Sequence, residues 1–226
     1  MMVLGRLRNL TSKICDVLDA KLSFALMVVT VLLPLYGEVR RLTIDQWRTT
    51  PPVTVEVGDL VFRRDNGVWS KIFINASTRE RRFSHAGIVT RKDGHIEITH
   101  ADANERTGVG CVRSEDWSGF FSESIDGALF RYAGGSAVRK LIVDEARSRL
   151  NVPFDTGFDM TQTNKLYCSE FVREAVNSAV GRQVIGYTNV ALNKGFVAVD
   201  DCYRNEMILI AECCTNDVSS TKDCKK

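Results

Sequence analysis

The sequence predicts one α+β domain behind an N-terminal hydrophobic segment. Between residues 53 and 132, short runs alternate apolar and polar residues, as strands of a half-buried sheet do. Residues 136–150 and 168–180 repeat apolar positions every three to four residues, which is typical of amphipathic helices. A run without charged residues, 22–36, precedes both patterns.

The composition is that of an ordinary globular protein. Of 226 residues, 44% are hydrophobic and 26% are charged, which is enough apolar material for a real core. The net charge is only +2, so we expect no nucleic-acid partner.

The apolar run 22–36 follows a basic stretch, as in a secretory signal or a signal anchor. It is shorter than the ~20 residues of a straight membrane-spanning helix, and no small-residue cleavage site follows it. A buried core helix is the alternative. We expect a leader over 1–50 and an exported or membrane-anchored protein, whose catalytic domain contacts the membrane or lies in the envelope.

The domain is expected over 53–212, with a polar tail at 213–226. Pro51 and Pro52 mark its beginning, because proline and the residue before it disfavour helix. Strands are predicted at 57–62, 84–90, 95–101, 127–132 and 206–212.

Asp93-Gly94 is a strong signal for a two-residue hairpin turn. A hairpin closed there places His85 opposite Asp102 and Gly87 opposite His100. Side chains alternate between the two faces of a strand, so both histidines and Asp102 share one face. The two histidines are then diagonal neighbours, close enough for one to orient the other.

Cys168 begins the predicted helix 168–180. Unpaired N–H groups and the helix dipole at that end favour a thiolate, so we expect a lowered thiol pKa. With His85 as base and His100 as orienting group, Cys168 has the parts of a nucleophilic site. Asp102 is the reserve candidate for the orienting role. The alternative is an inert, buried cysteine.

The seven cysteines include no C-x-x-C pair, and the chain has only three histidines. No metal-ligand spacing is recognisable, and we predict neither a metal nor another cofactor. An odd number of cysteines fits one free thiol with disulfides among the others, in an oxidising compartment.

Three segments carry a family resemblance when taken in order. They are Val57–Phe62 (VGDLVF), Ser84–Val89 (SHAGIV) and Leu166–Val172 (LYCSEFV). An aromatic and aspartate-containing lead-in at 153–159 precedes the last one. Over roughly residues 53–210, the sequence resembles the permuted papain-like amidases, the YiiX-like branch of the NlpC-type cysteine hydrolases.

The resemblance implies a circularly permuted papain-like (NlpC-type) fold, an antiparallel sheet or open barrel packed on helices. It also implies that Cys168 is the nucleophile, His85 the general base and His100 the polar orienting residue. Tyr167 would lie beside the thiol and shape the oxyanion site or the substrate pocket.

The function expected is cysteine-dependent hydrolysis of amide bonds through a thioester, on a cell-wall peptide or another short acylated peptide. A lipid-directed acyltransferase, thioesterase or phospholipase on the same scaffold is the alternative, which makes the partner a peptide or an acyl lipid. A non-catalytic, membrane-anchored binding module is the third interpretation.

Five further residues have mainly structural interpretations. Glu170 follows the thiol by two helix positions and should point away from it, as a carboxylate favoured at a helix start. Asp59 is expected to cap a turn. Trp47, Trp69 and Trp117 could line a pocket, but buried tryptophans mostly belong to the core.

Overall fold

The computed structural model describes residues 40–187, 189–191 and 194–214. These residues belong to one compact unit, Val39–Lys226. The apolar run 22–36 lies outside the described residues, as does the tail beyond 214. Within the described ranges, no helix combines the length and apolarity that a membrane crossing requires.

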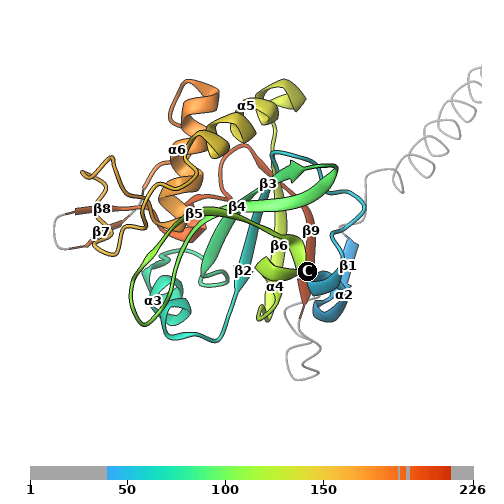
Figure 1. Ribbon diagram of the computed structural model, residues 1–226, viewed down its shortest axis with the longest axis horizontal. Coiled ribbons are helices and arrows are strands. Elements are labelled where there is room, and N and C mark those ends of the chain that lie inside the picture. Colours follow the sequence, from blue (N-terminus) through green and yellow to red (C-terminus); the bar gives the residue numbers. More distant parts are fainter. Residues whose placement is uncertain (1–39, 188, 192–193, 215–226) are drawn as a thin grey trace, which may run out of the picture. The chain divides into compact units, whose positions relative to one another are not determined.

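The described chain is built around a seven-stranded sheet with the order β1-β9-β6-β2-β3-β4-β5 (Figure 1). Its strands are β1 (Arg40–Thr43), β2 (Leu60–Arg64), β3 (His85–Lys92), β4 (His95–Ala103), β5 (Gly110–Asp116), β6 (Asp126–Tyr132) and β9 (Met207–Cys214). β1 runs parallel to β9, and the other neighbours are antiparallel. The predicted α+β class is confirmed, with the sheet open rather than closed.

Helices cover both faces of this sheet. They are α2 (Ile44–Thr49), α3 (Val68–Ala76), α4 (Trp117–Phe121), α5 (Gly135–Ser148) and α6 (Cys168–Val180). A 3-10 turn, η2 (Val199–Asp201), and a two-stranded ribbon of β7 (Asn189–Ala191) and β8 (Lys194–Phe196) complete the described elements.

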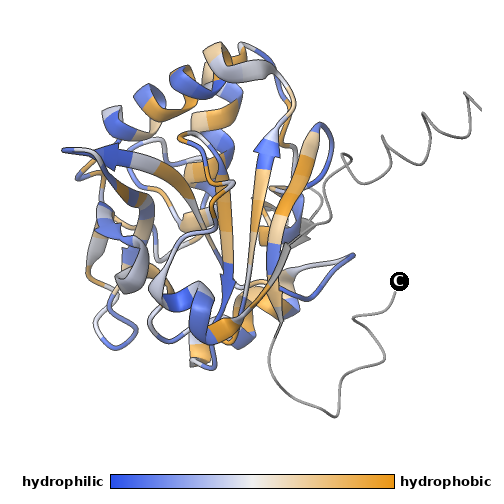
Figure 2. Ribbon diagram, turned by 90° about the vertical axis from the view of Figure 1, so that its right-hand side faces the viewer, coloured by the Kyte–Doolittle hydropathy of each residue, from blue (hydrophilic) through white to orange (hydrophobic). Residues whose placement is uncertain are grey.

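The period-2 alternation of the strands supplies two cores. Leu60 and Ile88 pack with residues of α5 and α6 on one face. Val61, Val89 and Ile98 pack with α2 and α4 on the other. Figure 2 shows the resulting hydrophobic stretches along the strands. Each face buries apolar surface, the dominant favourable contribution to folding.

The predicted hairpin is confirmed in its register. Val89 pairs with Ile98 and Lys92 pairs with His95, as a turn at residues 93 and 94 requires. Asp93 and Gly94 have φ values of 50° and 85°, the left-handed pair of a type I′ turn.

The domain begins earlier than predicted. Residues 40–49, which we placed with the leader, form β1 and α2. Trp47 of α2 is fully buried, with its ring 5.5 Å from that of Trp117. The last strand also continues to Cys214, beyond the expected start of the tail at 213. A four-residue strand and a six-residue helix are too short to leave a periodic signal.

Candidate active site

Cys168 is the first residue of α6, and its thiol is fully buried against the start of β3. Its helix packs on the face of β3 that carries Ala86, whose small side chain admits the close approach. Burial raises the pKa of the thiol to about 12, although backbone hydrogen bonds from Ala86 and Ser169 act to lower it. The predicted lowering of this pKa is therefore wrong, because desolvation outweighs the amide groups at the helix start.

The two histidines meet as the hairpin register predicts. Nε2 of His85 lies 2.8 Å from Nδ1 of His100, a hydrogen bond between buried rings. Both rings also pack against Phe120, with centroid distances of 5.6 and 5.1 Å. The adjacency of the two is confirmed, whereas their catalytic roles stay predictions.

Glu115 of β5 is a neighbour of this pair that the sequence did not reveal. It stands opposite Ile98, and Arg113 stands opposite His100, so all lie on one face. Oε1 of Glu115 is 2.9 Å from Nε2 of His100. The two atoms lie at hydrogen-bond distance, although the ring N–H is bent away from the straight line between them, and the contact acts to raise the pKa of His100. Residues 110–116 are mostly polar and gave no strand signal.

The electrostatics of the site keep both histidines neutral near pH 7. Burial and the nearby Arg63 place the pKa of His85 well below its ordinary value. Burial also lowers the pKa of His100, although contact with Glu115 opposes the shift.

Asp102, the reserve candidate for the orienting role, has an arginine as its hydrogen-bond partner. It accepts a hydrogen bond from Arg113 at 2.7 Å rather than from a histidine. Burial raises its pKa, but His85 and Arg113 outweigh this and bring it to about 2. Asp102 is thus an ionised carboxylate beside the site and does not orient His85 by a hydrogen bond.

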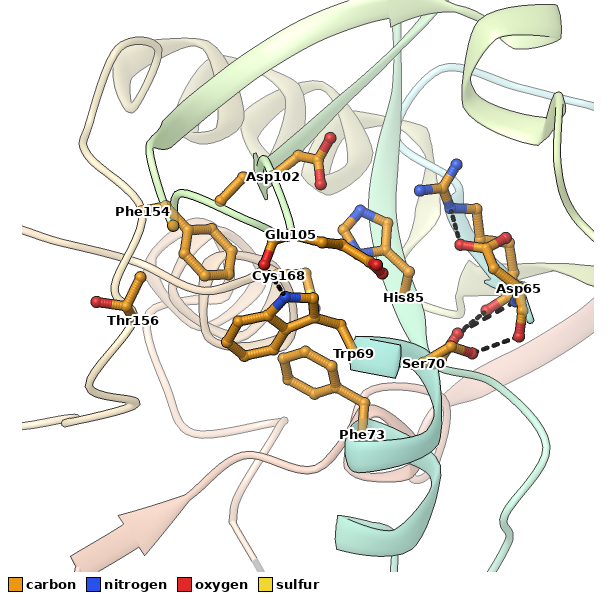
Figure 3. A pocket seen from close by; sticks show the side chains of 14 residues that line it. Asp65, Trp69, Ser70, Phe73, His85, Asp102, Glu105, Phe154, Thr156 and Cys168 are labelled. Atoms are coloured by element: carbon orange, nitrogen blue, oxygen red, sulfur yellow. Dashed lines mark hydrogen bonds and ion pairs between the residues drawn. The ribbon is translucent and has the colours of Figure 1, made fainter. Parts of the chain in front are cut away.

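A pocket of about 520 Å³, including its part open to solvent, is lined by both the Cys168 thiol and the His85 ring (Figure 3). Its walls contain three aromatic rings, three carboxylates and one guanidinium. These are Trp69, Phe73 and Phe154; Asp65, Asp102 and Glu105; and Arg63. Cys168 and His85 also line it, and His100 supports His85 from outside the lining.

Tyr167 lies in the core, and the structure does not place it in the lining of the pocket that contains Cys168. Its hydroxyl accepts the backbone N–H of Val197 at 2.9 Å, and its ring stacks on Phe196 at 5.2 Å. The side chain is fully buried in the core.

The remaining sequence candidates have structural roles, with one exception. Trp69 lines the pocket, whereas Trp47 and Trp117 lie in the core. Asp59 caps its turn by accepting the N–H of Glu56 at 2.8 Å, as predicted, and it also pairs with the half-buried Arg131.

Glu170 is buried, and its carboxyl accepts the backbone N–H of Tyr167 at the helix start. Burial raises the pKa of this carboxyl to about 8. Its expected place at the helix start is confirmed, but the group is neutral near pH 7 rather than the charged carboxylate we predicted.

His85, His100 and Asp102 offer ligand atoms within 4.8 Å of one another, a cluster that sequence spacing did not show. A metal bound there would have to replace the hydrogen bond between the rings and the one from Arg113 to Asp102. The arrangement of these residues does not fit a resident metal ion.

A cysteine opening a buried helix, a histidine lining the same pocket and a second histidine behind it define a papain-like cysteine hydrolase. The model of the family described as "Permuted papain-like amidase enzyme, YaeF/YiiX, C92 family" matches residues 54–207. The chain belongs to this family.

Among solved structures, metalloprotein yiiX (DUF1105) from Escherichia coli O157:H7 is similar, with a TM-score of 0.60 and 17% identity. The similarity covers 70% of this chain and 97% of that one, and it shows a shared fold. No curated protein matches the sequence.

Proposed function

We propose that the protein hydrolyses amide bonds of a cell-wall peptide or another short acylated peptide, with Cys168 as nucleophile and His85 as general base. The observation that carries the proposal is that both side chains line one pocket, while Nε2 of His85 is hydrogen-bonded to His100. Nδ1 of His85 is then the nitrogen left for the thiol proton.

The chemistry runs in two halves. His85 takes the thiol proton as sulfur attacks the amide carbonyl carbon, and the tetrahedral intermediate collapses when His85 protonates the leaving amine. This leaves a thioester on Cys168. His85 then removes a proton from water, which attacks the thioester and releases the carboxylic acid with the thiol restored. Asp102 stabilises the imidazolium that forms in each half.

The charge of the pocket favours a peptide over a phospholipid. Asp65, Asp102 and Glu105 line this pocket, and Arg63 in the lining and Arg113 on Asp102 leave one negative charge in excess, so a protonated amine is attracted and a phosphodiester is repelled. The aromatic wall suits an apolar side chain or a short acyl group beside that amine.

A lipid-directed acyltransferase, thioesterase or phospholipase is the second candidate, and one observation favours it. Val68 and Val109 are 69% and 76% exposed, next in sequence to the pocket residues Trp69 and Gly108. These two side chains offer apolar surface to an acyl chain beside the pocket.

We also propose that the domain acts at the membrane or in the envelope. The basic stretch followed by the uncharged run 22–36 supports this location. Fractionation of the full chain against a variant lacking 1–38 tests it. Recovery of both forms in the soluble cytoplasmic fraction would contradict it.

The activity is tested with muropeptides and phospholipids offered to the same preparations. We expect muropeptide cleavage that is abolished in Cys168→Ala and His85→Ala and kept in the matched control His95→Ala, whose histidine is exposed. Cleavage of phospholipid alone would favour the second candidate. Binding without cleavage of either would favour a non-catalytic module.

A further inference from the structure

We propose that Glu115 is a positioning residue that sets the tautomers of both buried histidines. By doing so, it leaves the lone pair of His85 Nδ1 available to the thiol. The catalytic consequence rests on the proposed function, whereas the tautomers themselves do not.

Glu115, His100 and His85 contact one another in succession. Oε1 of Glu115 is 2.9 Å from Nε2 of His100. Nδ1 of His100, the other ring nitrogen, is 2.8 Å from Nε2 of His85. Each nitrogen of His100 therefore has a polar neighbour, and its ring is fully buried, so water does not compete for either side.

The proton positions follow from the chemistry of these groups. A carboxylate can only accept, so the nitrogen facing it must carry the proton of the neutral ring. With Nε2 of His100 protonated, its Nδ1 has a lone pair and accepts the Nε2 proton of His85. Nδ1 of His85 is then unprotonated. The reverse arrangement would place a proton on Nδ1 of His85 and prevent it from acting as a base.

Glu115 is held as an ionised acceptor by its surroundings. Burial acts to raise its pKa, but the contacts with His100 and Arg113 bring the pKa below its ordinary value. Arg113 donates to Glu115 at 3.1 Å and to Asp102 at 2.7 Å, so it spaces the two carboxylates on the same face. The other charge facing the histidines is Arg63 of β2, which disfavours an imidazolium.

The competing interpretation is that Glu115 merely pairs with Arg113 near the surface. The two interpretations differ in the histidine nitrogens, which nitrogen NMR of the full chain distinguishes by tautomer. The chain has only three histidines, and the exposed His95 serves as the internal reference. Glu97→Gln, which removes one charge on the opposite face of β4, is the matched control.

We expect the wild type and Glu97→Gln to show both buried rings with the proton on Nε2. Glu115→Ala should populate the Nδ1–H form of both rings, and amide hydrolysis should fall on the order of 10²-fold, as for loss of general-base function. Glu115→Gln should restore part of the Nε2–H population and part of the hydrolysis rate, because its amide oxygen can accept a hydrogen bond from His100. This variant also serves if the alanine variant does not fold.

Folded Glu115 variants with unchanged tautomers would overturn the proposal, as would a wild type with Nδ1–H rings. If the tautomers shift as expected but the wild type cleaves no amide, the proposed function fails and the role of Glu115 stands. If the wild type hydrolyses amides and the tautomers do not change in the Glu115 variants, the proposed function stands and the role of Glu115 fails.

Discussion

Alkylation of the Cys168 thiol should accelerate about tenfold per pH unit between pH 6 and pH 10, without levelling off. Burial raises the pKa of the thiol from 9.0 to about 12. Three pKa units correspond to about a 10³-fold smaller thiolate fraction, and at pH 7 the fraction is on the order of 10⁻⁵. Because the thiolate is the reactive species, the rate follows this fraction throughout the range.

This expectation describes a resting site with a neutral thiol beside a neutral imidazole. Proton transfer to His85 then accompanies the attack on the substrate rather than preceding it. His85→Ala should therefore leave the slope of the alkylation profile unchanged, even though it abolishes turnover.

The assay is quantitative mass spectrometry of iodoacetamide-labelled peptides at a series of pH values. Cys111, which is free and partly exposed, supplies the internal reference for reagent reactivity. The slope is compared rather than the absolute rate, because burial of Cys168 also slows reagent access.

A plateau at or below pH 8.5 in the wild type, lost in His85→Ala, would refute the reasoning. It would mean that a thiolate–imidazolium pair exists before substrate binds, and that the pair outweighs the desolvation of the thiol.

Three substitutions test other parts of the structure. Burial raises the pKa of Glu170 to about 8, so the folded state loses stability as pH rises from the ordinary titration range of a carboxyl toward 8. Glu170→Gln should therefore raise the unfolding free energy, measured by urea denaturation, by on the order of 2 kcal/mol at pH 8 and by little at pH 4. Asp59→Asn should lower the unfolding free energy by on the order of 1 kcal/mol at pH 7, because the half-buried Arg131 loses its 2.7 Å partner but keeps Glu56; an unchanged urea midpoint would contradict this. A Cβ at Gly87 would lie 2.6 Å from a neighbouring side chain and 3.2 Å from Cβ of His100, so Gly87→Ala should displace that ring and lower amide hydrolysis about tenfold or more, with a melting-temperature loss of only a few degrees. Full activity of Gly87→Ala would show that the ring position is not critical.

The sequence by itself determined the features that depend on neighbours along the chain. The Asp93-Gly94 turn sets the register of one hairpin, and that register alone brings His85 and His100 to adjacent positions on one face. The apolar period likewise marks the helix that Cys168 begins. Local backbone geometry decides such features, so short sequence patterns predict them.

Only the tertiary structure decided what surrounds those residues. Glu115 reaches His100 because β5 pairs with β4, and its polar strand has no local signal. The Tyr167 hydroxyl accepts the N–H of Val197, thirty positions away, and the side chain packs in the core rather than in the pocket wall. The raised pKa of Cys168 has the same origin, because burial depends on long-range packing that desolvates the thiol more strongly than a helix end stabilises its charge.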